Sequence, residues 1–196
     1  MVIDATGPQV HGAGEWLAET HGGRGRRSWR KLHLAVDPGS GEILASELTT
    51  TEEGDASQVS PLLDQITSPI ASVIADGAYD GEPVYRAVAE CQPDPPAAVV
   101  VPPRASAVPS PTADTAPTQR DQHLRVIREK GRMGWQRAAD YDKRSLRETA
   151  VSRYKTIIGR GLRARTLPAQ KTEARVGCSV LDRMTRLGMP VSQRTA

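Results

Sequence analysis

The chain has 196 residues, 38% of them hydrophobic, and its 26 Lys and Arg against 23 Asp and Glu give a net charge of +3. This length and composition indicate an ordinary core, so we expect residues 1–196 to form a single domain. No apolar run approaches the roughly 18 residues of a membrane span, and the first residues carry no signal-like stretch, which predicts a cytoplasmic protein without a membrane partner. Cys91 and Cys178 belong to no Cys-x-x-Cys pair, and we expect both to be buried thiols.

Short apolar runs alternate with stretches of helical spacing along the chain. Residues 31–37 alternate between polar and apolar as a strand does, and turn residues at 38–41 connect them to a second strand. Glycines mark residues 7–25 as a loop, and the Ala, Ser, Thr and Pro of residues 104–118 predict a flexible loop. In chain order the sequence predicts strands at 1–4, 31–37, 42–50, 71–75 and 97–101, and helices at 55–66, 82–91, 119–131, 143–159 and 168–186.

This order of elements fits an α/β fold with a mixed five-stranded sheet flanked by helices. A hairpin followed by strand–helix–strand units is what a ribonuclease H-like sheet requires, with the first strand at its centre. In such a sheet, acids at strand ends converge at the carboxyl edge, where ligands of α/β proteins tend to bind. Asp4 and Asp76 each follow a short β-branched run, so both are expected at that edge.

A polar stripe is predicted along the helix near residues 143–159. At 100° per residue, four side chains fall within about 60° of arc: Tyr141, Arg144, Glu148 and Lys155. The expected buried side of this helix carries Leu146, Ala150, Tyr154 and Ile157. A carboxylate between cations and a phenol is suited to holding a metal ion beside phosphate groups. Taken singly, Asp4 and Asp76 also fit turn residues, and Glu148 fits a solvated helix residue paired with Arg144.

The net charge hides an acidic part and a basic part of the chain. Residues 1–119 carry 7 Lys and Arg against 16 Asp and Glu, which gives −9, whereas residues 120–196 carry 19 against 7, which gives +12. One basic cluster lies inside the acidic part and consists of Arg24, Arg26, Arg27, Arg30 and Lys31. Such asymmetry favours contact with a polyanion, with a solvated basic face as the alternative.

These motifs resemble those of the DDE transposases of bacterial insertion sequences, in the IS-five-like group with an IS-four-like transposase domain. The likeness extends over almost the whole chain, and the Tyr-Arg-Glu-Lys spacing is a specific signal within it. The matching segments are Asp4–Gly7, Gly14–Trp16, Arg26–Asp37, Ala75–Asp80, the helix with Tyr141, Arg144, Glu148 and Lys155, and Arg183–Pro190.

The resemblance implies a ribonuclease H-like catalytic domain that cuts transposon ends and joins them to target DNA. Asp4, Asp76 and Glu148 would hold two Mg²⁺ or Mn²⁺ ions, with Asp4 bridging the two. The implied DNA contacts are Tyr141, Arg144 and Lys155, with Arg26, Arg27, Arg30 and Lys31 as a second group. The implied partners are transposon-end and target DNA, and a second copy of the chain on that DNA.

Members of this family usually carry a DNA-binding segment before the first catalytic strand. Because Asp4 is almost at the start of the chain, we expect that segment to be absent here, and an upstream reading frame is a source that could supply it. Two alternatives stay open: a catalytically silent remnant that binds DNA non-specifically, and a ribonuclease H-like nuclease without end specificity. Asp37 and Asp80 lie close to motif residues, and we expect both to be structural.

Overall fold

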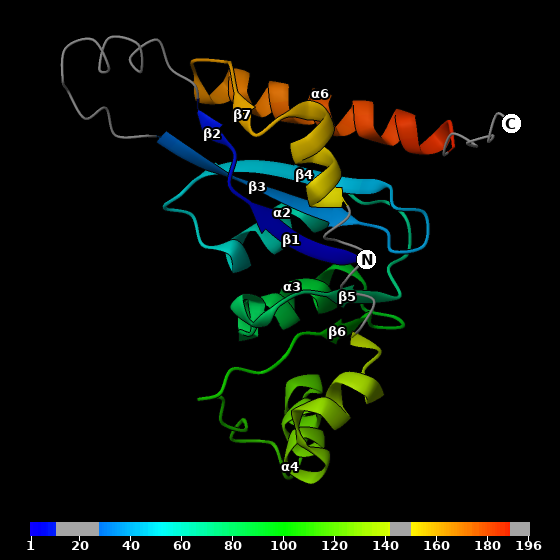
Figure 1. Cartoon of the computed structure of the whole chain (residues 1–196). Coiled ribbons are helices and arrows are strands. Elements are labelled where there is room, and N and C mark those ends of the chain that lie inside the picture. Colours follow the sequence, from blue (N-terminus) through cyan, green and yellow to red (C-terminus); the bar gives the residue numbers. More distant parts are fainter. Residues whose placement is uncertain (11–27, 142–149, 189–196) are drawn as a thin grey trace, which may run out of the picture.

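The structure is a computed structural model that describes residues 1–10, 28–141 and 150–188. Its five main strands are β1 (Val2–Thr6), β3 (Ser28–Val36), β4 (Ile43–Thr50), β5 (Ser72–Ile74) and β6 (Ala98–Val100). Strand β1 is central, with the antiparallel β3 and β4 on one side and the parallel β5 and β6 on the other (Figure 1). This mixed arrangement with a central first strand confirms the predicted ribonuclease H-like fold.

Two further strands bring the total to seven among the described residues, where five were predicted. They are β2 (Gln9–Val10) and β7 (Gly161–Leu162), and β2 pairs with the start of β3 and with β7. This pairing explains why β3 begins three residues before the predicted strand. A pair of two-residue strands is too short to show alternation, and β2 lies in the glycine-rich stretch that predicted a loop.

Helices cover both faces of the sheet and extend beyond its end. The longer ones are α3 (Glu82–Cys91), α4 (Gln119–Ala138) and α6 (Leu167–Arg186), and the short ones are η1 (Asp55–Gln58), α2 (Val59–Leu63), η2 (Gly77–Tyr79) and the π-helix η4 (Tyr154–Ile158). In Figure 1, α6 lies beyond β3 and β4 at one end of the molecule, and α4 lies beyond β6 at the other. Helix α4 extends beyond its predicted end at residue 131. The chain kinks at Gly131, with φ +71°, and a second helical stretch then continues to Ala138. None of the helices in the described residues is long and apolar enough to span a bilayer.

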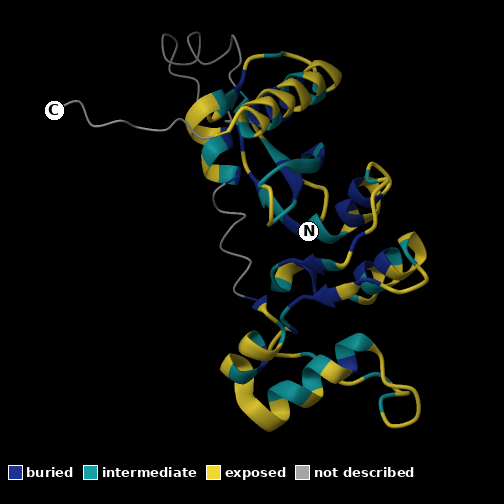
Figure 2. Cartoon of the chain, turned by 90° about the vertical axis from the view of Figure 1, so that its right-hand side faces the viewer, coloured by how far each residue is buried: buried dark blue, intermediate teal, exposed yellow. Residues whose placement is uncertain are grey.

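The core divides into separate clusters because side chains alternate between the two faces of each strand. Ile3 and Ala35 face α2 and α3, whereas Leu32 and Leu34 face α6 and η4. Figure 2 shows the buried residues concentrated in the strands and on the inward sides of the helices. Helix α6 approaches η4 so closely that a Cβ on Gly177 would lie 3.0 Å from Ile158 Cγ2 and 3.1 Å from Tyr154 Cε2.

Two burial predictions are wrong. Ile157 is 45% exposed, and Ile158 packs in its place. In η4 the Gly159 N–H donates to the carbonyl of Tyr154, five residues back, and this wider turn moves the inward position on by one residue.

The second concerns the cysteines. Cys178 is buried, and this burial raises the pKa of its thiol to about 11, but Cys91 is exposed at the end of α3. The neighbouring Gln92 is half-buried instead, and its Oε1 accepts a hydrogen bond from the Ile70 N–H at 2.7 Å.

Candidate active site

Asp4 and Asp76 lie at matching positions on neighbouring parallel strands. Val2 of β1 is in register with Ile74 of β5, and each aspartate comes two residues later along its chain. A step of two residues returns a side chain to the same face, and neighbouring strands are about 4.8 Å apart. The two half-buried carboxylates therefore belong to the same face of the sheet. Asp76 follows the end of β5, as predicted, but Asp4 is the middle residue of β1 and not its end, because β1 continues to Thr6 through its pairing with β3.

That face is covered by the segments on either side of residues 142–149. Val2 and Ile74 pack with Trp135 and Tyr141. Leu34 is the cross-strand partner of Asp4, and it belongs to the cluster of Ala150 and Tyr154. Tyr141 and Ala150, the described residues that flank residues 142–149, therefore both pack on this face of the sheet.

Two predicted site residues, Arg144 and Glu148, lie outside the described residues, as do Arg26 and Arg27. Tyr141 is described, and it is only 6% exposed. Its ring packs against Trp135, with centroids 5.4 Å apart. These surroundings give Tyr141 a packing role in the cluster with Trp135, and its contact with a sugar or phosphate stays a prediction.

The Asp76 carboxylate sits at the start of a tight turn. Its Oδ1 accepts a hydrogen bond from the Ala78 N–H at 2.8 Å, which begins the short helix η2. No other hydrogen bond to this carboxylate occurs among the described residues. Gly77 is close to a neighbouring loop, since a Cβ there would lie 3.3 Å from the carbonyl oxygen of Pro102.

Two arginines far along the chain hold this turn in place. Arg104 donates from its guanidinium to the carbonyls of Gly77 and Ala78, at 3.3 and 3.2 Å. Arg120 donates through Nε and Nη2 to both oxygens of Asp80, at 2.7 and 3.0 Å, and the Arg104 N–H also donates to Asp80. The loop after β6 and the start of α4 are therefore fastened to the segment that carries Asp76.

The charge of Asp80 is stabilised despite its burial. Burial alone would raise the pKa of Asp80, but hydrogen bonds from Arg120 and Arg104 and their positive charges outweigh it and lower the pKa below its usual value. The structure thus gives Asp80 the structural role that we predicted. Asp37 is also engaged in a turn, where it accepts the Ser40 N–H at 2.7 Å.

Arg104 and Arg120 were missed by sequence reasoning. The motif around Asp76 contains an acid at position 80, and a buried acid needs a cationic partner. Nothing in the spacing of the chain indicates which arginine, 24 or 40 residues away, provides it.

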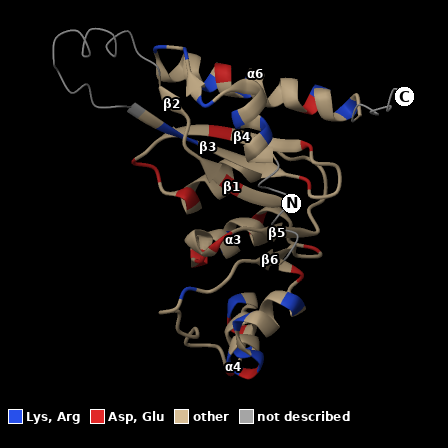
Figure 3. Cartoon of the chain, viewed as in Figure 1, with Lys and Arg blue, Asp and Glu red and all other residues tan. Residues whose placement is uncertain are grey.

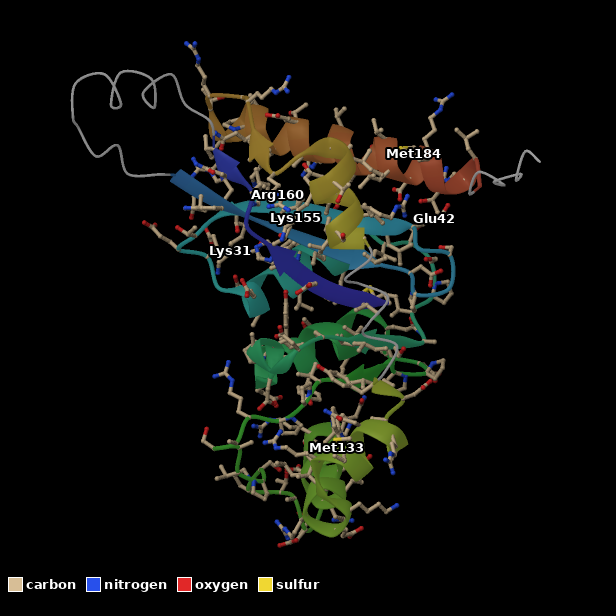
Figure 4. All side chains as sticks on the ribbon, viewed as in Figure 1. Lys31, Glu42, Met133, Lys155, Arg160 and Met184 are labelled. Atoms are coloured by element: carbon tan, nitrogen blue, oxygen red, sulfur yellow. The ribbon has the colours of Figure 1, made fainter. Side chains whose placement is uncertain are left out.

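The basic cluster Arg24–Lys31 does not form one patch in its described part, which lies within β3. Arg30 and Lys31 are consecutive on a strand, so they face opposite sides of the sheet. The Arg30 Nε donates to the buried Gln170 at 2.8 Å, whereas Lys31 forms an ion pair with Asp55 at 2.9 Å. Lys155, by contrast, is exposed on η4, and no ion pair or hydrogen bond to its side chain occurs among the described residues (Figure 4).

The donor set at the sheet edge suits a hard divalent cation. Half-buried carboxylate oxygens are the ligands that Mg²⁺ and Mn²⁺ prefer. Residues 1–10, 28–141 and 150–188 contain no group of three potential ligands close enough to hold a metal ion. Asp4 and Asp76 are two carboxylates on one face of the sheet, and Glu148, the third predicted ligand, lies outside the described residues.

A family model described as a transposase DDE domain matches residues 1–178. No solved structure matches the chain. The match covers most of the sequence and includes every candidate acid, and the subgroup within the family is not resolved by it. The chain therefore belongs to the transposase DDE domain family, whose members cut and transfer DNA strands in transposition and generally use divalent metals.

Proposed function

We propose that Asp4, Asp76 and Glu148 form the catalytic triad of this chain, which cleaves insertion-sequence ends and transfers them into target DNA. The register of Val2 with Ile74 carries the proposal, because it puts two acids on one face of the sheet at the same level. Glu148 lies two residues before Ala150, which packs on that face, and this supports its assignment as the third acid.

The three carboxylates would hold two divalent ions, which lower the pKa of bound water and stabilise the charge that develops on the leaving oxygen. Asp4 is the best placed to bridge them because its strand is central. The hydrogen bond from Ala78 to Asp76 Oδ1 fixes the direction of that carboxylate. Arg144 and Lys155 would orient the phosphate backbone, Arg144 as a bidentate donor and Lys155 as a point charge.

Metal binding tests the triad independently of catalysis. In the full chain, Asp4→Asn, Asp76→Asn and Glu148→Gln should each weaken Mn²⁺ binding by at least about tenfold, measured by titration. Asp64→Asn is the matched control, because Asp64 is an exposed acid just after α2. Unchanged Mn²⁺ affinity in any of the three variants would remove that residue from the site.

Cleavage then decides between an enzyme and a silent remnant. The substrate is a duplex that carries the inverted repeat flanking the gene, with Mg²⁺ present. The intact chain should cut it and the triad variants should not. Binding of Mn²⁺ without cleavage, either alone or with the product of an upstream reading frame, would favour the remnant. Sedimentation of the chain on this duplex would test the proposed homodimer.

A further inference from the structure

A run of cations without acids leads from η4 through β7 into α6. Residues 150–172 contain six Lys and Arg and no Asp or Glu. Four of these six side chains are exposed, and we call them the β7 basic segment: Lys155, Arg160, Arg163 and Arg165. Figure 3 shows cations along this part of the chain, and Figure 4 labels Lys155 and Arg160 on successive parts of it.

The β7 basic segment is not neutralised within the described part of the chain. No ion pair or side-chain hydrogen bond to its four members occurs there, whereas cations nearby in the fold are engaged. Lys171 and Arg175 both pair with Glu47. The next acid along the chain, Glu173, is occupied by the backbone N–H groups of Arg163 and Ala164 at 2.8–3.0 Å. Cations on an ordered backbone that no described acid neutralises are suited to bind an external polyanion.

Strand β3 sets the distance between this segment and the candidate acids. Asp4 pairs with Leu34, and Gln9 pairs with Trp29, which precedes Leu34 by five residues on β3. The Gln9 N–H donates to the carbonyl of Arg160 at 2.9 Å, so Arg160 lies beside that second position. Five residues of antiparallel strand span about 17 Å. This is the length of about five base pairs of B-form DNA, at 3.4 Å each.

The backbone of the segment is held in a defined path. Gly159 has φ +122°, a conformation that residues with side chains rarely adopt, and it turns the chain from η4 into β7. Leu162 is buried against the α6 cluster, and the Glu173 carboxylate fixes the residues that follow it. This fixed path keeps the three arginines in a constant order on the surface, and the planar guanidinium of each loses less freedom per hydrogen bond to phosphate than a lysine ammonium does.

We propose that Arg160, Arg163 and Arg165 bind the phosphate backbone of duplex DNA about five base pairs from the phosphate that is cut. This inference rests on the proposed function, because it takes the acids at the carboxyl edge as the cutting site. It adds residues that lie outside the Tyr-Arg-Glu-Lys stripe and gives them a positioning role. They hold the flanking duplex while the acids act on one phosphate.

Salt dependence of DNA binding tests the contact without any need for catalysis. The variants are Arg160→Gln, Arg163→Gln and Arg165→Gln, singly and together, in the full chain with a 30-base-pair duplex in EDTA. Each phosphate contact contributes about 0.9 to the slope of log K against log salt, so each single variant should reduce that slope by about 0.9 and the triple variant by about 2.7. Arg86→Gln is the matched control, because Arg86 is exposed on α3, which packs on the opposite face of the sheet. The triple variant should melt at the wild-type temperature, since its three side chains contribute no hydrogen bond or ion pair to the described fold.

Two outcomes would overturn the proposal: a triple variant with the wild-type slope, or one whose slope changes no more than that of Arg86→Gln. The five-base-pair placement has its own test. It uses a duplex that contains the phosphate to be cut, and the DNA on each side of that phosphate is shortened in turn from eight to three base pairs. Shortening the side that the arginines contact should abolish the difference in DNA affinity between wild type and the triple variant. If that difference remains whichever side is shortened, the placement is refuted. Asp76→Asn separates this proposal from the function itself, because it should abolish cleavage but keep the wild-type slope.

Discussion

The ion pair between Asp80 and Arg120 predicts a large effect of its removal on the free energy of unfolding. Asp80→Asn keeps the shape of the side chain but removes its charge and one of its two acceptor oxygens. The carboxylate accepts two hydrogen bonds from Arg120 and one from the Arg104 N–H, and its side chain is 0% exposed.

The expected cost follows from the burial of the two partners. Removing one partner of a buried ion pair typically costs about 3–5 kcal/mol, because the other charge is left uncompensated. The Arg120 side chain is 22% exposed, so water can reach the guanidinium and the low end of that range applies. We expect Asp80→Asn to lower the free energy of unfolding by about 3 kcal/mol. Asp55→Asn is the control, since the pair of Asp55 with Lys31 is 29% and 28% exposed and should be worth less than about 1 kcal/mol.

Urea unfolding of wild type, Asp80→Asn, Arg120→Gln and the double variant measures the pair directly. The double-mutant cycle should give a coupling of about 2 kcal/mol. The pKa of Asp80 is lowered in the folded state, so its contribution is present above the unfolded pKa near 4 and is lost as the pH falls below that value. The stability difference between wild type and Asp80→Asn should therefore shrink between pH 6 and pH 3. A coupling below about 0.5 kcal/mol, or a difference that grows as the pH falls, would refute the reasoning.

Two further predictions concern the contact between α6 and η4. Gly177→Ala adds a methyl group that would meet Ile158 and Tyr154 at 3.0–3.1 Å, so crowding of about 1–3 kcal/mol should exceed the helix-propensity gain of about 1 kcal/mol and lower the melting temperature. Ser179→Ala, an exposed position on the same helix, is the control and should not lower it. Ile158→Ala should destabilise the chain by about 2 kcal/mol in urea, whereas Ile157→Ala should cost less than about 0.5 kcal/mol; equal costs would contradict the π-helical turn.

The fold could be predicted from the sequence where each element has a strong local signal. Alternation and turn chemistry indicate the β3–β4 hairpin, and the observed α3 spans the predicted 82–91. The errors fall where tertiary pairing decides. Strand β2 forms by pairing with β3 and β7, and β7 forms by pairing with β2, and no property of two isolated dipeptides signals these pairings.

The candidate site shows the same division. Asp4 and Asp76 stand out in the sequence because each acid comes directly after a short β-branched run. That signal gives the strand end correctly for Asp76 but not for Asp4, since β1 runs two residues past Asp4, to Thr6. The opposite orientation of Arg30 and Lys31 was not predicted. Consecutive residues point to opposite faces only where the chain is a strand, and the predicted strand begins at residue 31, after Arg30. The partners of Asp80, Arg104 and Arg120, lie 24 and 40 residues away in the chain. Residue spacing in one sequence does not predict contacts of that length.

The register of β3 is fixed by the apolar core rather than by any metal. A slip of one residue against β1 would turn every side chain of β3 to the other face and remove Leu32 and Leu34, which are both fully buried, from their cluster with α6 and η4. Burying each leucine contributes about 2 kcal/mol, so the pairing of Leu34 with Asp4 persists when the acid is changed. Asp4→Asn and Asp76→Asn should for this reason unfold cooperatively at temperatures close to that of the wild type in EDTA. A variant that lost both Mn²⁺ affinity and its melting transition would show that the carboxylate holds the strands together, and its loss of metal could not then be assigned to coordination.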